Sequence, residues 1–344
     1  MPDISLADIG WDPRRADEAA THPAAGPGVH PGRVVRVERD LVRAATEDGL
    51  VAVPSVGLAV GDWVLTDGAS WASVLDRRTA LRRKDSGQTS DEQLLAANVD
   101  VVVVVEPMDP RPNVRRVERM ATLAWASGAT PLVVLTKSDL ALGGEVADVE
   151  AVVPGVEVLE VSAETGDGLE GVRSHLAAGR TFVLLGPSGA GKSTLVNALA
   201  GTEVLATGDV RGDGRGKHTT THRELVPVPG LGCLVDTPGI RGVGLVADED
   251  GLEQAFPEVV ARAAGCRFVD CEHRTEPGCA VLEAIEDGAL PEARLSSYRH
   301  LLREIAHQTA RKTSQDRSAL RSRGRQANRS KRESMTAKGR GPTA

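Results

Sequence analysis

The stretch 186–193 reads Gly186-Pro187-Ser188-Gly189-Ala190-Gly191-Lys192-Ser193 and lies between an apolar run at 182–185 and a helical pattern at 193–200. The pattern G-x-x-x-x-G-K-S between a strand and a helix predicts a phosphate-binding loop. Glycines let backbone N–H groups turn inward around phosphates, and the helix aims its positive end at the anion. We expect Lys192 to reach the outer phosphates and Ser193 to hold Mg²⁺, with Thr194 completing the nucleotide contacts.

The chain around this loop alternates short apolar runs with helical patterns. Such alternation predicts a parallel sheet covered by helices on both faces, which is an α/β fold. We expect strands at 101–105, 131–135, 156–161, 182–185 and 233–236, and helices at 114–127, 169–178 and 193–200.

Two further motifs end predicted strands and favour guanine over adenine. The first reads Thr136-Lys137-Ser138-Asp139, and its aspartate can accept from the two N–H groups that guanine has and adenine lacks. The second, Ser162-Ala163, offers a backbone N–H to the guanine oxygen. Each motif alone is weak, but doubly wound sheets bind ligands at the carboxyl ends of their strands, so together they predict a guanine site.

A third motif, Asp236-Thr237-Pro238-Gly239, follows the last predicted strand. Here Asp236 is expected to hold Mg²⁺ through water, and the N–H of Gly239 to sense the γ-phosphate. Where Ras-like enzymes place a glutamine after this motif, the chain has Ile240, which cannot orient water. We therefore expect slow intrinsic hydrolysis and dependence on a partner, with His218 or His222 as alternative sources of a polar contact.

Three cysteines and a histidine lie within 14 residues near the C-terminus: Cys266, Cys271, His273 and Cys279. Three thiolates and one imidazole suit a closed tetrahedral Zn²⁺ site, and full coordination indicates a structural metal. The fourth cysteine, Cys233, lies in an apolar run and is expected to be a core thiol. Four cysteines in 344 residues exclude a disulfide scaffold and point to the cytoplasm.

Charge is distributed unevenly along the chain. Residues 303–344 contain 12 Lys+Arg and 3 Asp+Glu, which is a net charge of +9. Because the whole chain carries −7, the other 302 residues carry a net charge of −16. A basic tail on an acidic body is typical of a tail that meets a polyanion, although a solvated helix end is the simpler alternative.

Composition excludes two further classes of protein. Aromatic residues make up only 2%, which argues against binding by many stacked bases. No apolar run reaches the roughly 18 residues of a membrane span.

The N-terminal third has a different pattern. Residues 1–28 are rich in Ala, Pro, Gly and Asp without periodicity and predict a disordered arm. Short strands separated by turn signals then predict a small five-stranded barrel. They are expected at 33–38, 41–46, 50–54, 62–66 and 70–75. After residue 248 the chain reads as helical, ending in an amphipathic helix at 291–307 with an apolar stripe of Leu295, Tyr298, Leu301, Leu302 and Ile305.

The order of the motifs is unusual, because the guanine motif at 136–139 and Ser162-Ala163 precede the phosphate loop. A circular permutation preserves a site while moving the chain ends. The chain thus resembles the circularly permuted GTPases. With the barrel and the segments around Cys266–His273 and Cys279, it is specifically similar to the ribosome small subunit-dependent GTPase A family (RsgA, also called YjeQ) over residues 30–305.

This resemblance implies an N-terminal OB-fold, a permuted P-loop GTPase domain and a C-terminal helical zinc-binding domain. It also implies a GTP hydrolase that acts as a nucleotide-controlled switch in late maturation of the small (30S) ribosomal subunit, binds rRNA and is stimulated by the subunit. The stretch 214–221 is similar to the family's switch I, where either Thr219 or Thr220 closes over Mg²⁺. The guanine motif departs from the usual Asn-Lys-x-Asp at Thr136, while Asp139 is retained.

The expected boundaries are a disordered arm at 1–28, an OB-fold at 29–85, the GTPase domain at 86–247, the zinc-binding domain at 248–308 and a basic tail at 309–344. We expect a cytoplasmic monomer that contacts GTP or GDP and rRNA but no membrane. Two alternatives come from other classes, namely a nucleotide kinase with a cysteine-bound lid and a non-catalytic rRNA chaperone. The guanine motif argues against the kinase, whereas Ile240 makes the chaperone less remote than it would be with a glutamine at this position.

Overall fold

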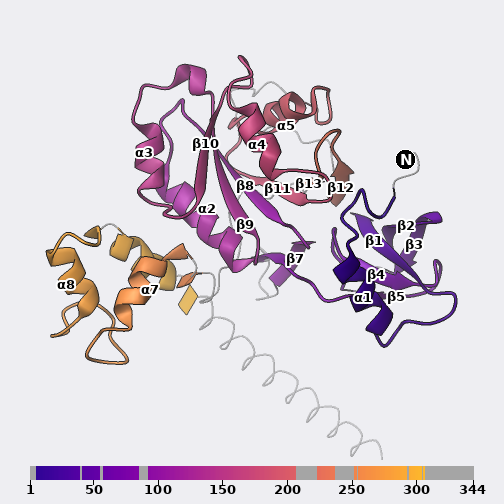
Figure 1. Ribbon diagram of the computed structural model, residues 1–344, viewed down its shortest axis with the longest axis horizontal. Helices are drawn as coiled ribbons and strands as arrows, with labels where there is room; N and C mark the ends of the chain where they lie inside the picture. Colours follow the sequence, from indigo (N-terminus) through magenta and orange to yellow (C-terminus); the bar gives the residue numbers. More distant parts are fainter. Residues whose placement is uncertain are drawn as a thin grey trace, which may run out of the picture.

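The computed structural model describes residues 5–38, 41–54, 57–84, 92–206, 223–236, 252–253, 255–292, 294–303 and 305–306 (Figure 1). One long sheet runs through most of the molecule, with strand order β10-β9-β8-β11-β13-β12-β1-β2-β3. Among the described residues, no helix has the length and apolar character needed to cross a membrane.

Five parallel strands form the centre of this sheet and confirm the predicted α/β core. They are β8 (Val101–Pro107), β9 (Thr130–Thr136), β10 (Glu157–Val161), β11 (Thr181–Leu185) and β13 (Cys233–Asp236). The valines of β8 are buried on both faces, as expected for a strand without a solvent side. Val102 and Val104 belong to one hydrophobic cluster, and Val101, Val103 and Val105 belong to another.

Helices cover both faces of these strands. On one face, α2 (Val114–Ala126) packs on β8 and β9, with α3 (Glu145–Glu150) beside it. The other face is covered by α4 (Leu169–His175) and α5 (Lys192–Ala200). The sequence prediction missed α3, which has two buried residues in a six-residue span and so a weak helical period.

The N-terminal strands have the order β3-β2-β1-β4-β5, close to the predicted ranges. They are β1 (His30–Val37), β2 (Leu41–Thr46), β3 (Gly49–Pro54), β4 (Trp63–Thr66) and β5 (Ala72–Val74). All pair antiparallel, around a small core of Val34, Val42, Ala44, Val53 and Val64. Among the described strands no ladder joins β3 to β5, so hydrogen bonding leaves the barrel open along that seam.

Three strands were not predicted. A hairpin of β6 (Ala80–Lys84) and β7 (Glu92–Ala97) spans the expected boundary at 85/86. Strand β12 (Arg223–Pro227) pairs antiparallel with β13 on one side and with β1 on the other, which joins the N-terminal strands to the central sheet. Only Leu225 of β12 is fully buried. The strand therefore lacks the alternation of apolar and polar residues by which a sequence reveals a half-buried strand.

The prediction of a disordered arm is wrong for residues 5–28. Helix α1 (Pro13–Thr21) begins after Asp12, whose carboxylate accepts from the N–H of Arg15 at 2.7 Å, and Pro13 occupies a first-turn position. Leu6 and Ile9 are buried, and so is the Arg15 side chain. Composition alone did not show this, because the segment is ordered by contacts with residues far away in the chain.

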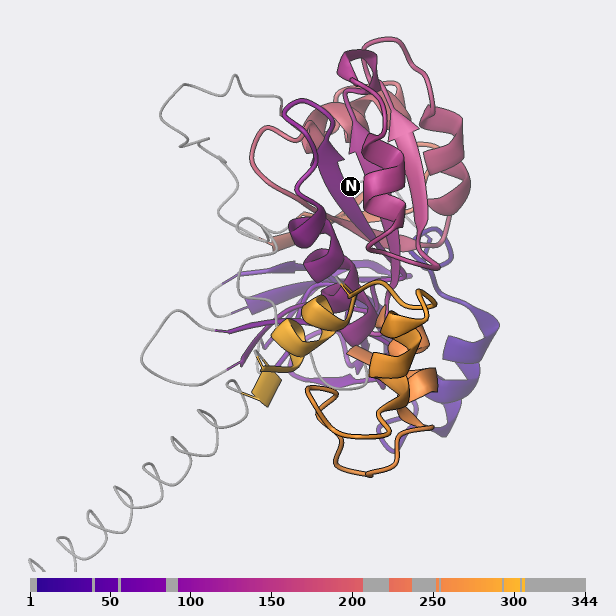
Figure 2. The same ribbon diagram turned by 90° about the vertical axis from the view of Figure 1, so that its left-hand side faces the viewer.

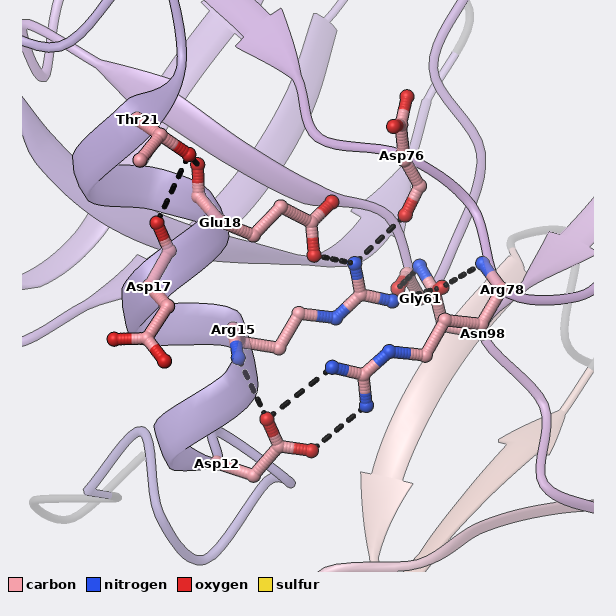
Figure 3. A network of polar contacts seen from close by, with 9 residues as sticks. All are labelled: Asp12, Arg15, Asp17, Glu18, Thr21, Gly61, Asp76, Arg78 and Asn98. Atoms are coloured by element: carbon pink, nitrogen blue, oxygen red, sulfur yellow. Dashed lines mark hydrogen bonds and ion pairs between the residues drawn. The ribbon is translucent and has the colours of Figure 1, made fainter.

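Asn98, just after β7, lies at the centre of those contacts (Figure 3). Its Oδ1 accepts from Arg15 Nη2 at 2.6 Å and from the backbone N–H of Arg78 at 3.0 Å. Its Nδ2 donates to the carbonyl of Gly61 at 3.0 Å. Arg15 Nη1 also donates to Glu18 and to the carbonyl of residue 76, each at 2.7 Å. The buried amide of Asn98, which lies between β7 and β8, thus connects helix α1 with the N-terminal strands and the central sheet.

Arg33 makes a second joint between the same parts. It is fully buried on β1, donates to Thr181 Oγ1 of β11 at 2.7 Å and to the carbonyl of Ile9, and stacks on Trp63 at 4.9 Å. Burial lowers the pKa of Arg33 to about 10, which still leaves the guanidinium charged at neutral pH. A buried charge is stable only with such partners, so Arg33 fixes β1 against the sheet.

The C-terminal part contains α7 (Pro257–Ala263), α8 (Ala280–Glu286) and helical residues between 292 and 306, shown in orange and yellow beside α2 (Figures 1 and 2). Arg294 attaches it to the central fold. This buried guanidinium contacts Glu118 of α2 at 2.9 Å, Glu258 at 2.7 Å and the Val152 carbonyl at 2.6 Å. The stripe of the last helix is confirmed at Leu295, Leu301 and Ile305, whereas Leu302 is 36% exposed.

We expect Arg15→Ala to lower the free energy of unfolding of the N-terminal part by about 3 kcal/mol, because it leaves buried polar partners unpaired. Urea unfolding followed by tryptophan fluorescence measures this, since Trp11 and Trp63 pack together nearby at 4.9 Å. The exposed neighbour Arg14 gives the matched control, and Arg14→Ala is expected to change stability by less than about 0.5 kcal/mol. Equal effects of the two substitutions would contradict the proposed joint.

Candidate functional site

The predicted phosphate loop leaves the end of β11 and leads into α5, as its sequence pattern requires. Gly186, Gly189 and Gly191 have φ of 153°, 80° and 81°, a region that L side chains rarely adopt. A Cβ on Gly186 would lie 2.1 Å from the carbonyl oxygen of Val105 on the neighbouring strand β8. Only glycine fits there, and this close approach sets the direction in which the loop leaves the sheet.

Lys192 begins α5 and folds back over the loop. Its Nζ donates to the carbonyls of Gly186 at 3.0 Å and Pro187 at 2.7 Å. Ser193 lies in the first turn of the same helix, where unpaired backbone N–H groups and the helix dipole favour an anion. The loop therefore has the ammonium, the hydroxyl and the backbone donors that a nucleotide phosphate needs.

The guanine motif follows β9 and touches the phosphate loop directly. Thr136 is buried, and its Oγ1 donates to the carbonyl of Ala190 at 2.7 Å. The sequence raised doubt here, because threonine replaces the usual asparagine at this position. In the structure this threonine hydroxyl links the loop at 136–139 to the loop at 186–193.

The second predicted guanine element, Ser162-Ala163, lies beside the first. Ser162, at the end of β10 and 1% exposed, donates from Oγ to Asp139 Oδ1 at 2.7 Å. The same oxygen accepts from the N–H of Thr165 at 3.1 Å, which orients the hydroxyl toward the carboxylate. Asp139 therefore has one oxygen held by Ser162, and Ala163 follows at the same edge of the sheet.

Sequence reasoning missed an ion pair between a buried carboxylate, Glu106, and the partly exposed Arg116 beside the site. Glu106 lies one residue before the end of β8 and is 1% exposed. Its carboxylate accepts from Arg116 Nε at 2.9 Å, from Arg116 Nη2 and from the N–H of Asn113 at 3.0 Å. This pair closes the loop that contains Asp109, whose carbonyl accepts from Lys137 Nζ at 3.3 Å. A glutamate directly after five valines was the available signal, since burying a carboxylate requires a specific partner.

Asp236 ends β13, which pairs in parallel with the strand that carries the phosphate loop. The aspartate and Ser193 thus belong to the same edge of the sheet and supply a carboxylate and a hydroxyl, oxygen ligands that suit Mg²⁺. Residues 207–222 and 237–250 lie outside the described residues. They include the predicted site residues Thr219, Thr220, Gly239 and Ile240 and the two histidines His218 and His222.

The predicted metal ligands converge in the C-terminal part. The ligand atoms of Cys266, Cys271, His273 and Cys279 all lie within 4.8 Å of one another, a cluster that can hold a metal ion. His273 Nδ1 lies 3.4 Å from Cys279 Sγ and 3.6 Å from Cys266 Sγ. Burial lowers the pKa of His273, which favours the neutral imidazole that binds metals.

The loop between these ligands has its own support. The Glu276 carboxylate accepts from the backbone N–H groups of Glu272, Arg274 and Thr275 at 2.6–2.9 Å. Hydrogen bonds from backbone N–H groups, first of all that of Glu276 itself, lower the pKa of the Glu276 carboxyl to about 2.

The fourth cysteine, Cys233, lies apart from this cluster, in β13. It is 1% exposed, and burial raises the pKa of its thiol. This burial confirms the prediction of a core cysteine.

We expect Thr136→Ala to weaken the binding of a fluorescent guanine nucleotide about fivefold, because one hydrogen bond between the two loops is lost. Thr136→Ser keeps the hydroxyl and is expected to bind within about twofold of the unmodified chain. Fluorescence titration with N-methylanthraniloyl GDP measures both variants. Equal weakening by alanine and serine would show that the methyl group, rather than the hydroxyl, supports the site.

Comparison with known proteins gives consistent results. The RsgA GTPase family matches residues 74–246. The protein named small ribosomal subunit biogenesis GTPase RsgA from Streptomyces coelicolor is 46% identical over 336 residues, covering 92% of this chain and 91% of the relative. The protein of the same name from Streptomyces avermitilis is 48% identical over 321 residues, covering 87% of this chain and 85% of the relative.

Solved structures resemble the fold over most of its length. YjeQ from Thermotoga maritima superimposes with a TM-score of 0.61 at 25% identity, covering 81% of this chain and 99% of YjeQ. YloQ, described as a circularly permuted GTPase, has a TM-score of 0.59 at 23% identity, covering 83% and 98%. In this chain, too, the guanine motif precedes the phosphate loop. On the family match and the identity to its relatives, the chain belongs to the RsgA GTPase family.

Proposed function

We propose that the chain is a nucleotide-controlled switch that acts late in maturation of the small ribosomal subunit, binds its rRNA and is stimulated by it. Membership in the RsgA family makes the chain a GTP hydrolase of small-subunit biogenesis. The observation that carries the proposal is the direct contact between base-reading and phosphate-binding loops, from Thr136 Oγ1 to the Ala190 carbonyl. This contact makes one pocket of motifs that lie more than 45 residues apart.

Asp139 is proposed to select guanine. Its carboxylate accepts from the two N–H groups on the edge of the base, while Ser162 holds one of its oxygens at 2.7 Å. Lys137 lies along the same edge, with its Nζ fixed on the carbonyl of Asp109. Adenine lacks the paired donors and would leave the Asp139 carboxylate without its partners, which costs more than a missing apolar contact.

Phosphate binding and hydrolysis are assigned to the end of β11 and the start of α5. The backbone N–H groups of 188–193 and the Lys192 ammonium would bind the phosphates, and Ser193 and Asp236 would hold Mg²⁺. The metal supplies neutralisation of charge on the β- and γ-phosphate oxygens when it is bound. Because Ile240 cannot orient water, the polar group that completes this task is proposed to come into place only with the partner bound.

The C-terminal cluster is proposed to hold one structural Zn²⁺. Three thiolates and one imidazole complete a tetrahedron, which leaves no position for substrate. The Arg294 contacts support a role for this part as a fixed extension of the central fold, because its guanidinium joins Glu258 to Glu118 of α2. Binding free energy of the metal would then stabilise the loop 266–279.

The proposed domains follow the sequence boundaries: an OB-fold at 29–85, the GTPase domain at 86–247, the zinc-binding domain at 248–308 and a basic tail at 309–344. The strand order β3-β2-β1-β4-β5 supports the OB-fold. The arginine-rich tail, which lies outside the described residues, is proposed to contact rRNA phosphates. We further propose a monomer that works in the cytoplasm, where ribosomes are assembled.

The decisive experiment is phosphate release from GTP by the full chain with and without purified small subunits. Hydrolysis is expected to be slow alone and to rise by about two orders of magnitude with subunits, in the manner of partner-stimulated GTPases. ATP should give no stimulated release. Unchanged release with subunits would overturn the switch and favour a chaperone that uses nucleotide only for shape.

We expect Cys279→Ser to reduce bound zinc from about one equivalent to well below half, since closed sites require all four ligands. Cys233→Ser is the matched control, because that cysteine is also buried but lies outside the cluster. Zinc released under denaturing conditions and quantified with a chromogenic chelator gives the stoichiometry. Equal zinc content in the two variants would contradict the assignment.

A further inference from the structure

Strand β12 brings charged residues of the N-terminal strands into line with Asp236. In its ladder with β13, Glu224 lies opposite Asp236, and in its ladder with β1 the same Glu224 lies opposite Arg36. Residues opposite one another in antiparallel strands share a face, with Cβ atoms about 4.5–5.5 Å apart. Arg36, Glu224 and Asp236 therefore form a row across three strands, and Figure 1 shows β12 next to β13 at the side of the sheet that faces β1.

The row has an uneven charge distribution. Glu224 and Asp236 place two carboxylates opposite each other, which is unfavourable unless a cation is near. Arg36 supplies one, because its Nη2 lies 2.8 Å from Glu224 Oε1, with side-chain exposures of 36% and 21%. Beyond Arg36 the row continues to Arg43 on β2, which has its own partner in Glu38 at 3.4 Å.

We propose that Arg36 and Glu224 are positioning residues for the magnesium site. The carboxylate of Glu224 makes the potential at Asp236 more negative and so strengthens the hold on Mg²⁺, whereas Arg36 offsets part of that charge. The N-terminal strands therefore set the electrostatics of a site in the GTPase core through one ion pair. This inference rests on the proposed assignment of Asp236 to Mg²⁺.

Substitutions of the two partners should act in opposite directions. Glu224→Gln removes negative charge near Asp236, so the Mg²⁺ concentration for half-maximal nucleotide retention should rise about threefold. Arg36→Gln leaves Glu224 without its counter-charge, so the same concentration should fall about twofold. Both variants break the same ion pair, and a purely structural role would move both values in the same direction.

The charge swap R36E/E224R gives a stricter test. It keeps an ion pair between β1 and β12 but places a cation opposite Asp236, so the half-maximal Mg²⁺ concentration should rise about sixfold. Glu157→Gln is the matched control, because Glu157 is an exposed glutamate at the start of β10, at the far edge of the sheet. It should leave the Mg²⁺ dependence unchanged.

The measurement is the dissociation rate of N-methylanthraniloyl GDP from the full chain across a range of Mg²⁺ concentrations, with thermal unfolding to confirm that each variant folds. Opposite shifts for the two single variants support the inference, and these suffice if the swap does not fold. Shifts of the same sign, or a swap that behaves as the unmodified chain, overturn it. Retention that does not depend on Mg²⁺ in the unmodified chain would instead overturn the proposed magnesium assignment itself.

Discussion

The close approach of the phosphate loop to strand β8 is the constraint on which the site depends. Gly186 lies so near the Val105 carbonyl that any Cβ would overlap it. That contact directs the loop across the carboxyl edge of the sheet, where the Ala190 carbonyl meets Thr136. Because parallel strands end at one edge, the loops that follow β9, β10 and β11 lie at that edge whatever their order in the chain. A permuted order therefore leaves the chemistry intact.

Three buried polar side chains connect the parts of the molecule, and each does so in the same way. Asn98, Arg33 and Arg294 have low exposure and several partners drawn from different parts of the chain. A buried guanidinium or amide is favourable only when its hydrogen bonds are made, so these joints penalise any packing of the parts that leaves the polar groups buried without their partners. These contacts favour one arrangement of the parts relative to one another.

Strand β12 links the N-terminal strands to the central sheet. It contributes few buried side chains, yet it carries the backbone pairing between β13 and β1 and the ion pair of Glu224 with Arg36. In the sequence, the predicted switch I at 214–221 precedes β12, and the motif Asp236-Thr237-Pro238-Gly239 begins at the end of β13.

Sequence alone predicted most of the local pattern: the five parallel strands, three of the helices on them, the glycine-rich loop at 186–193 between a strand and a helix, and the four cysteine and histidine residues that converge in the C-terminal part. These are set by periodicity and by short motifs, which neighbouring residues encode. Only the tertiary structure decided that residues 5–28 are ordered, that β12 is a strand, that Thr136 reaches the phosphate loop and that Glu106 is buried beside it. Each of these depends on partners distant in the chain, such as Asn98 for Arg15 and Ala190 for Thr136. Local propensity contains no information about such partners, because the contact free energy exists only once the distant segments have come together.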